Sequence, residues 1–160
     1  MPYPLNHSPA DVVGQLLVDL GLGTSADVDT DADLGQWPVG VGNELEYPDE
    51  TLTVYDTAGR TDARFMPDGH LAEHHGIQLR VRGRDQQTAH LKARGVRRSL
   101  LTDVYDRTVY LADDVGTAAT AYVVHAVVGA GNVLSLGKNV PNDARSLFTV
   151  NFLVVIRPAN

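Results

Sequence analysis

Hydrophobic and polar residues alternate along much of this chain, a pattern typical of β-strands with one buried and one wet face. The clearest strands cover residues 51–56 and 76–83. Further strands are predicted at residues 37–42, 107–112, 120–128, 132–136 and 146–157. Residues 129–131 read Gly-Ala-Gly, which predicts a tight hairpin turn between two of these strands. We therefore expect the second half of the chain to be rich in strand.

Two segments have helical periodicity instead. Ser8 is a suitable N-cap, Pro9 suits the first turn, and the apolar residues at positions 12, 13, 16, 17 and 20 fall on one stripe. Gly21 then ends this helix. A second helix is predicted to begin after its cap, Asp85, and to run to about Thr102.

The predicted order is α-β-β-β-α-β-β-β-β, in one domain spanning residues 1–160. The layer arrangement expected for this order is α+β, a mainly antiparallel or mixed sheet with two helices packed on it. Ala58 to His75 form a long loop between two strands. Loops of such length are usually functional, disordered or ordered by a partner, and we expect this one (58–75) to be partner-ordered.

Composition narrows the class of protein. With 43% hydrophobic and 21% charged residues, the chain has the balance of an ordinary globular protein. It contains no cysteine, so disulfides and thiolate metal sites are excluded. No apolar run approaches the roughly 18–20 residues of a membrane helix, and Met1–Asn6 do not have the pattern of a signal peptide. We expect a protein that works, or is assembled, in the cytoplasm, without a membrane partner.

Charge is distributed unevenly. The net charge is −7, yet residues 1–59 hold 11 acids and no Lys or Arg, and all 13 Lys and Arg lie in residues 60–160. Seven of these bases fall between positions 80 and 98. This distribution has three possible explanations. The acidic half could face the basic segment of another copy, or the basic segment could contact phosphate. Alternatively, the acidic half and the basic segment are both exposed to solvent and contact no partner.

Candidate chemistry is sparse. His70, His74 and His75 cluster around Glu73, and a helix would place His70 and His74 at zinc-like spacing, but the flanking glycines favour a wet loop. His125 lies within an apolar strand, where a satisfied structural histidine is favoured over a catalytic base. We find no nucleophile elbow and no phosphate loop, and we expect neither an enzyme, nor a metal site, nor a cofactor.

Four aspartates alternate in an acidic linker over residues 23–36. They are Asp27, Asp29, Asp31 and Asp33. The glycine and glutamate positions that an EF-hand loop requires are not matched, so a flexible linker is the expectation.

Arg80, Arg82 and Arg84 alternate along one face of a predicted strand. Such a stripe either binds nucleic acid or pairs with acids of a neighbouring subunit. No aromatic residue interleaves with it. The strand alone leaves both alternatives open.

Several segments together resemble the tail-terminator or minor capsid (head–tail joining) proteins of long-tailed bacteriophages. The resembling segments are Ser8–Leu17, Trp37–Gly42, Leu52–Arg60, Gly76–Arg84 and Ser146–Asn151. The most specific pattern is Val-Tyr-Asp-Thr followed by Gly-Arg, with a Gly-x-Gln-x-Arg-Val-Arg strand after it.

The resemblance implies a structural virion protein at the tail–head junction, forming a hexameric ring that caps the head-proximal end of the tail tube. Its implied partners are further copies, the major tail tube protein and the head connector or stopper, with DNA present only in transit. From the charge distribution we expect a subunit or tube interface at the following arginines: Arg60, Arg64, Arg80, Arg82, Arg84, Arg94, Arg97 and Arg98. We expect Asp27, Asp29, Asp31 and Asp33 nearer the channel.

Three alternatives remain at this stage. A head-completion or stopper protein of the neck would share the size and charge of this chain. A nucleic-acid-binding module would use the arginine strand and the second helix. A small metal-dependent enzyme would use His70, Glu73 and His74.

Overall fold

The computed structural model describes residues 5–26, 36–61, 73–112, 118–138 and 144–159. Within these ranges the elements follow one another as α1 (Pro9–Asp19), β1 (Thr24–Ser25), β2 (Pro38–Val41), β3 (Thr51–Thr61), β4 (Glu73–Gly83), α2 (Gln86–Asp103), β5 (Tyr105–Ala112), β6 (Ala119–Gly129), β7 (Leu134–Lys138) and β8 (Ser146–Pro158). Both helices occur where the sequence predicts them, each beginning after its predicted cap, Ser8 or Asp85.

All eight strands of the described residues belong to one sheet, in the order β1-β2-β3-β4-β8-β6-β5, with β7 also paired to β8. Strands β1, β2 and β3 are parallel, and the remaining pairs are antiparallel. Strand β8 is the central strand: β4 pairs along one edge, while β6 and β7 share the other edge in succession.

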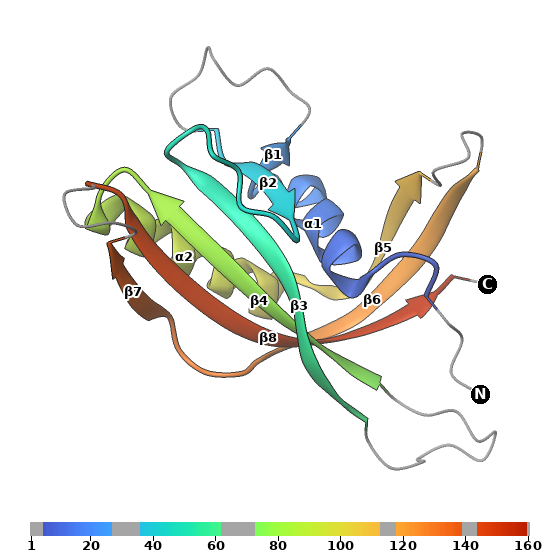
Figure 1. The fold of residues 1–160 in the computed structure, drawn as a ribbon. Coiled ribbons are helices and arrows are strands. Elements are labelled where there is room, and N and C mark those ends of the chain that lie inside the picture. The colour runs from blue at the N-terminus through green and yellow to red at the C-terminus, as the bar shows by residue number, and fades with distance from the viewer. Residues whose placement is uncertain (1–4, 27–35, 62–72, 113–117, 139–143, 160) are drawn as a thin grey trace.

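The predicted α+β class is wrong in two respects, the proportion of strand to helix and the shape of the sheet. Strands account for 52% of the described residues and helices for 23%, and the sheet curls into a half-barrel around the helices (Figure 1). Register shifts interrupt three strand pairs, at residues 57–60, 124–126 and 135–137. Bulges of this kind bend a strand and increase its twist, which the alternation pattern does not reveal.

The predicted hairpin turn at Gly129–Gly131 is also wrong. Strands β6 and β7 do not pair with each other; both run antiparallel to β8. Ala130 continues the ladder by donating its backbone N–H to the carbonyl of Asn151, at 2.9 Å. The glycines therefore allow an irregular step along one edge of β8, not a reversal of the chain.

The long loop predicted between residues 58 and 75 is shorter than expected, because both strands extend into it. Arg60 pairs with His74 and Thr61 pairs with Glu73, so β3 and β4 continue as a two-stranded arm. Residues 62–72 lie outside the described residues.

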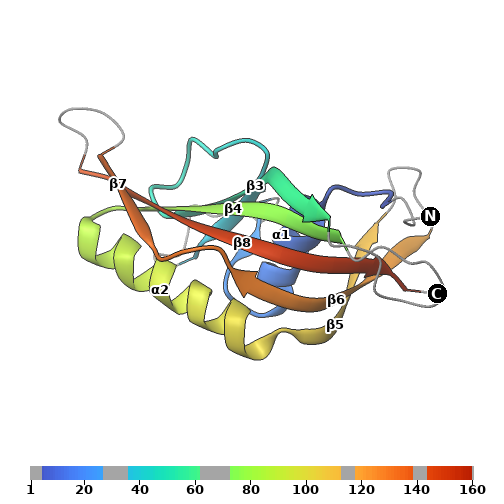
Figure 2. The ribbon, with the colours of Figure 1, turned by 90° about the horizontal axis from the view of Figure 1, so that it is seen from below.

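The core lies on one face of the sheet. Alternate residues of β3, β4 and β8, such as Val54, Leu79 and Val150, are 0–1% exposed and lie opposite one another in register. Each such side chain stabilises the fold by about 1.5–3 kcal/mol when fully buried. Both helices cover this face, as the two views in Figures 1 and 2 show.

Local sequence fixes how each helix meets the sheet. Ser8 and Asp11 form a capping box at the start of α1, and Asp56 of β3 accepts the backbone N–H of Ala10 at 2.9 Å. At α2, a Cβ added to Gly83 would lie 2.8 Å from the backbone nitrogen of Ala89. Gly83 and Ala89 therefore allow α2 to lie unusually close to β4.

Candidate interaction surfaces

Arg82, at the centre of the predicted arginine stripe, is buried. Its guanidinium donates to four backbone carbonyls of residues 45–49 at 2.6–3.3 Å, and it lies 3.9 Å from the carboxylate of Glu44. Only 3% of Arg82 is exposed. Within this chain, Arg82 therefore holds the segment 42–50 against the outer face of the sheet, the face away from the helices, and charge reversal there would report on folding.

The other two arginines of the stripe lie on either side of Arg82. Arg80 stacks over the ring of Tyr55 at 5.0 Å. Burial raises the pKa of Tyr55, while the charge of Arg80 acts in the opposite direction. Arg84 is more exposed and lies 3.6 Å from Glu50 and 3.7 Å from Asp85. The stripe is thus held by partners within the chain.

We use the name acidic loop for residues 42–50, which carry four acids and no Lys or Arg. Three of the acids face arginines: Glu44 faces Arg82, Glu50 faces Arg84, and Asp49 faces Arg145 at 3.7 Å. The fourth, Glu46, is exposed, and its carboxylate has no cationic partner among the described residues.

Tyr47 follows Glu46 and is 82% exposed, the highest value of any large hydrophobic side chain in the described residues. Exposed tyrosine rings are enriched in contact surfaces, and this ring lies beside a carboxylate that has no cationic partner among the described residues. The sequence pattern does not single out this pair, because Tyr47-Pro48-Asp49-Glu50 has the composition of an ordinary turn.

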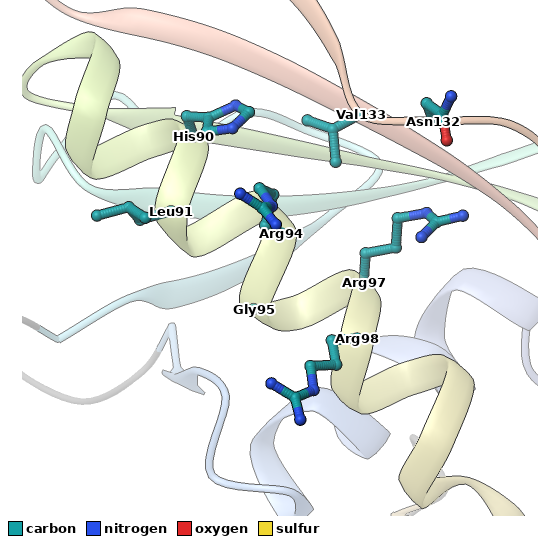
Figure 3. A pocket seen from close by; sticks show the side chains of 8 residues that line it. All are labelled: His90, Leu91, Arg94, Gly95, Arg97, Arg98, Asn132 and Val133. Atoms are coloured by element: carbon teal, nitrogen blue, oxygen red, sulfur yellow. The ribbon is translucent and has the colours of Figure 1, made fainter.

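A second surface lies on α2. We use the name basic groove for an open groove of about 710 Å³ between α2 and the connection from β6 to β7. Eight residues line it: His90, Leu91, Arg94, Gly95, Arg97, Arg98, Asn132 and Val133. Figure 3 shows Arg97 extending toward Asn132, while Arg98 extends in the opposite direction. His90, Arg94 and Arg97 follow helical spacing, so their side chains lie on one stripe of the helix, where Arg94 is exposed and the other two are partly buried.

The cations of α2 differ in how they are engaged. Lys92 donates to the carbonyl of Leu22 at 2.5 Å and stacks over Trp37, and burial lowers its pKa. Arg97 donates to the carbonyl of Gly131 at 3.3 Å. Among the described residues, no carboxylate lies within salt-bridge distance of any of the three arginines of the groove, Arg94, Arg97 and Arg98. Arg94 and Arg98 are the more exposed of the three.

The histidine cluster is only partly described. His74 and His75 lie in β4, after Glu73, and not in a wet loop, whereas His70 lies outside the described residues. Burial lowers the pKa of His75. Among the described residues, no group of three or more potential metal ligands is present.

His125 lies in β6 and is half-buried. Its Nδ1 lies 2.5 Å from the carboxylate of Asp106, at the start of β5. Asp106 has a φ of 45°, in the left-handed region, where aspartate is tolerated better than most residues. The pair links two neighbouring strands on the exposed side of the sheet.

Several predicted interface residues are not described. Arg60 is exposed near the end of β3, but Arg64 lies outside the described residues. The predicted channel-facing acids, Asp27, Asp29, Asp31 and Asp33, also lie outside them. Of the acidic linker, the structure describes its ends, including the two residues of β1.

No family model matches this chain, and no curated protein matches it. Neither of the helices in the described residues combines the length and the apolar character needed to cross a membrane.

Proposed function

We propose that this chain is a structural virion protein, a subunit of a ring that caps the head-proximal end of a bacteriophage tail tube. In this role it ends polymerisation of the tube and joins the tail to the head connector. The proposed partners are further copies of the chain, the tube protein and the connector. DNA passes through the ring, and no catalytic step is required.

The observation that carries the proposal is the arm formed by β3 and β4. Residues 56–61 of β3 are all exposed, and they remain paired with β4 as far as Thr61 and Glu73. Figure 1 shows this pair of strands projecting past the part of the sheet that the helices cover. A paired arm keeps its direction, so it is suited to reach a neighbouring subunit or the tube.

The resemblance to tail-terminator proteins supports the same role, because three of its segments contribute to one part of the fold. Leu52–Arg60 forms most of β3, Gly76–Arg84 covers most of β4, and Ser146–Asn151 forms the first half of β8. These three strands are neighbours in the sheet. The most specific pattern of the resemblance therefore lies at the base of the arm.

The proposed contacts follow from where the charged residues lie. Arg60 is on the arm, and Arg94, Arg97 and Arg98 are on α2. A position of Asp27, Asp29, Asp31 and Asp33 near the channel remains a prediction from charge. Repulsion between such acids and the phosphates of DNA would prevent the DNA from binding to the channel wall as it passes through the ring.

Immunogold electron microscopy of virions tests the proposal, with antibody raised against this chain and a knockout of its coding sequence in the same phage. We expect label at the head–tail junction and overlong tails in the knockout. Label at the junction with tails of normal length would assign the chain to a head-completion or stopper protein instead. Virions without label at the junction would reject a role in the neck.

A further inference from the structure

The acidic loop and the basic groove lie on opposite sides of the molecule. Arg82 holds the loop on the outer face of β4, whereas its neighbour Val81 points into the core beneath α2. Successive residues of a strand point to opposite faces, so this alternation separates the two surfaces. Figure 2 shows α2 and the segment before β3 on either side of strands β4 and β8.

The two surfaces are complementary in charge. The acidic loop has four acids and no base, whereas α2 carries Lys92, Arg94, Arg97 and Arg98 against one acid, Asp103. One acid of the loop, Glu46, and the three arginines of the groove have no oppositely charged partner among the described residues. Pairing them between copies would neutralise charges that the described part of a single chain does not pair.

Shape and chemistry also favour the acidic loop as the occupant of the groove. The bonds from Arg82 to four carbonyls fix the loop before any contact forms, which reduces the entropy lost on binding. Tyr47 presents a rigid ring, and the groove offers apolar surface at Leu91, which is 58% exposed, beside two arginines. Arginine guanidinium groups stack favourably on aromatic rings.

We propose that copies of this chain associate head to tail, with the acidic loop of one copy lying in the basic groove of the next. Glu46 pairs with Arg94 or Arg98 of the neighbour, and Tyr47 lies against Leu91. Because two different surfaces meet, the contact is heterologous and repeats around a closed ring or along a filament. The inference rests on the ring-forming role proposed above and names the surfaces that would build the ring.

Two variants of the full chain test the contact. Variant one carries Glu46→Gln and Tyr47→Ala in the loop; variant two carries Arg94→Glu and Arg98→Glu in the groove. Each is measured by sedimentation velocity at low ionic strength and high protein concentration. We expect oligomers larger than a dimer for the unmodified chain and at least about tenfold weaker association for each variant alone, since each loses charge pairs central to the contact.

A mixture of the two variants separates a head-to-tail contact from other modes. Variant one keeps an intact groove and variant two keeps an intact loop, so a one-to-one mixture should form a heterodimer that cannot grow further. The substitution Arg157→Glu serves as a matched control. Arg157 is exposed on β8 and lies outside both surfaces, so reversal of its charge should leave association unchanged. Circular dichroism confirms that each variant is folded.

Three results would overturn the inference: an unmodified chain that stays monomeric at every concentration, variants that assemble normally, or a mixture that does not form heterodimers. A different result would assign the groove to nucleic acid instead. The unmodified chain would bind a labelled DNA duplex without self-associating, and Arg94→Glu with Arg98→Glu would abolish that binding. None of these results depends on where the protein lies in a virion. Failure of this contact and failure of the proposed neck location are therefore distinguishable.

Discussion

At the scale of single residues, similar side chains close together in the sequence have different roles. Arg82 lies in β4 and Arg84 directly after its last residue, yet the side chain of Arg82 is 4% exposed and that of Arg84 is 57% exposed. The difference arises because four carbonyls of the acidic loop surround the guanidinium of Arg82, whereas Arg84 meets the carboxylates of Glu50 and Asp85 at the surface. A buried guanidinium is retained only where its donors and its charge are satisfied, and the carbonyls of residues 45–49 and Glu44 supply both.

Replacing Arg82 with leucine should lower the free energy of unfolding by about 3 kcal/mol or more, because four carbonyls and the carboxylate of Glu44 lose their partner. Urea denaturation measures this loss. Arg84→Leu is the matched control and should cost less than about 1 kcal/mol, as expected for an exposed ion pair. Equal losses for the two variants would contradict a structural role of Arg82.

His75 should make stability depend on pH. Burial lowers its pKa in the folded chain below the ordinary value of 6.5, although the charge of Glu73 acts in the opposite direction. Protonation therefore favours the unfolded state, and stability should fall as pH drops from about 6.5 through the folded pKa. Denaturation of the unmodified chain and of His75→Gln at pH 7 and pH 5.5 measures the effect. The substitution should reduce the loss on acidification; an unchanged loss would assign it to other groups.

At the scale of elements, the short distance between the backbones of α2 and β4 determines how α2 packs on the sheet. Gly83, at the end of β4, leaves no room for a Cβ against the backbone of Ala89. The apolar stripe of α2 is narrow and built partly on alanine, with Ala89 and Ala93 fully buried beside Val96 and Leu100. Small residues on both sides therefore fix the distance between helix and strand.

The substitution Gly83→Ala should destabilise the fold by about 1–3 kcal/mol, because α2 must shift away from β4 to accept the methyl group. Gly95→Ala makes the same chemical change within the exposed surface of α2, where no atom lies within 4 Å of the added Cβ. It should instead stabilise the helix by about 0.5–1 kcal/mol. Thermal unfolding of both variants checks the contrast, and effects of the same sign would count against the close packing.

At the scale of the whole molecule, charge is separated between faces. The acidic loop lies against the outer face of the sheet, whereas Arg94, Arg97 and Arg98 of α2 lie on the other side (Figures 2 and 3). The net charge of −7 is a sum over the whole chain and does not show this separation of charge. A molecule with two unlike faces is suited to head-to-tail association, which the arm of β3 and β4 can extend.

Association through these faces should depend strongly on salt. Raising ionic strength from about 0.1 M to about 1 M shortens the screening length from about 10 Å to about 3 Å. The exposed pairs between Glu46 and the arginines should weaken accordingly, and sedimentation velocity should record smaller species at high salt. Association that strengthens with salt would indicate an apolar contact, for example through Leu134 and Leu136 on β7.

The sequence by itself determined the elements whose signals are local. The cap residue Ser8 and an apolar stripe identify α1, Asp85 identifies the start of α2, and alternation identifies the first half of β3, most of β4 and nearly all of β8. These signals depend on neighbours within a few residues, so they can be recognised in the sequence without knowledge of the fold. The resemblance to tail-terminator proteins and its function remain predictions.

Only the tertiary structure decided which strands pair and which charges are left uncompensated. The glycines at 129 and 131 fit a hairpin turn as well as an irregular edge of β8, and the choice depends on a strand about 20 residues away. Likewise, alternation placed Arg80, Arg82 and Arg84 on one face of a predicted strand but did not indicate that residues 42–50 return to cover Arg82. Burial depends on contacts between distant segments, which local pattern does not encode.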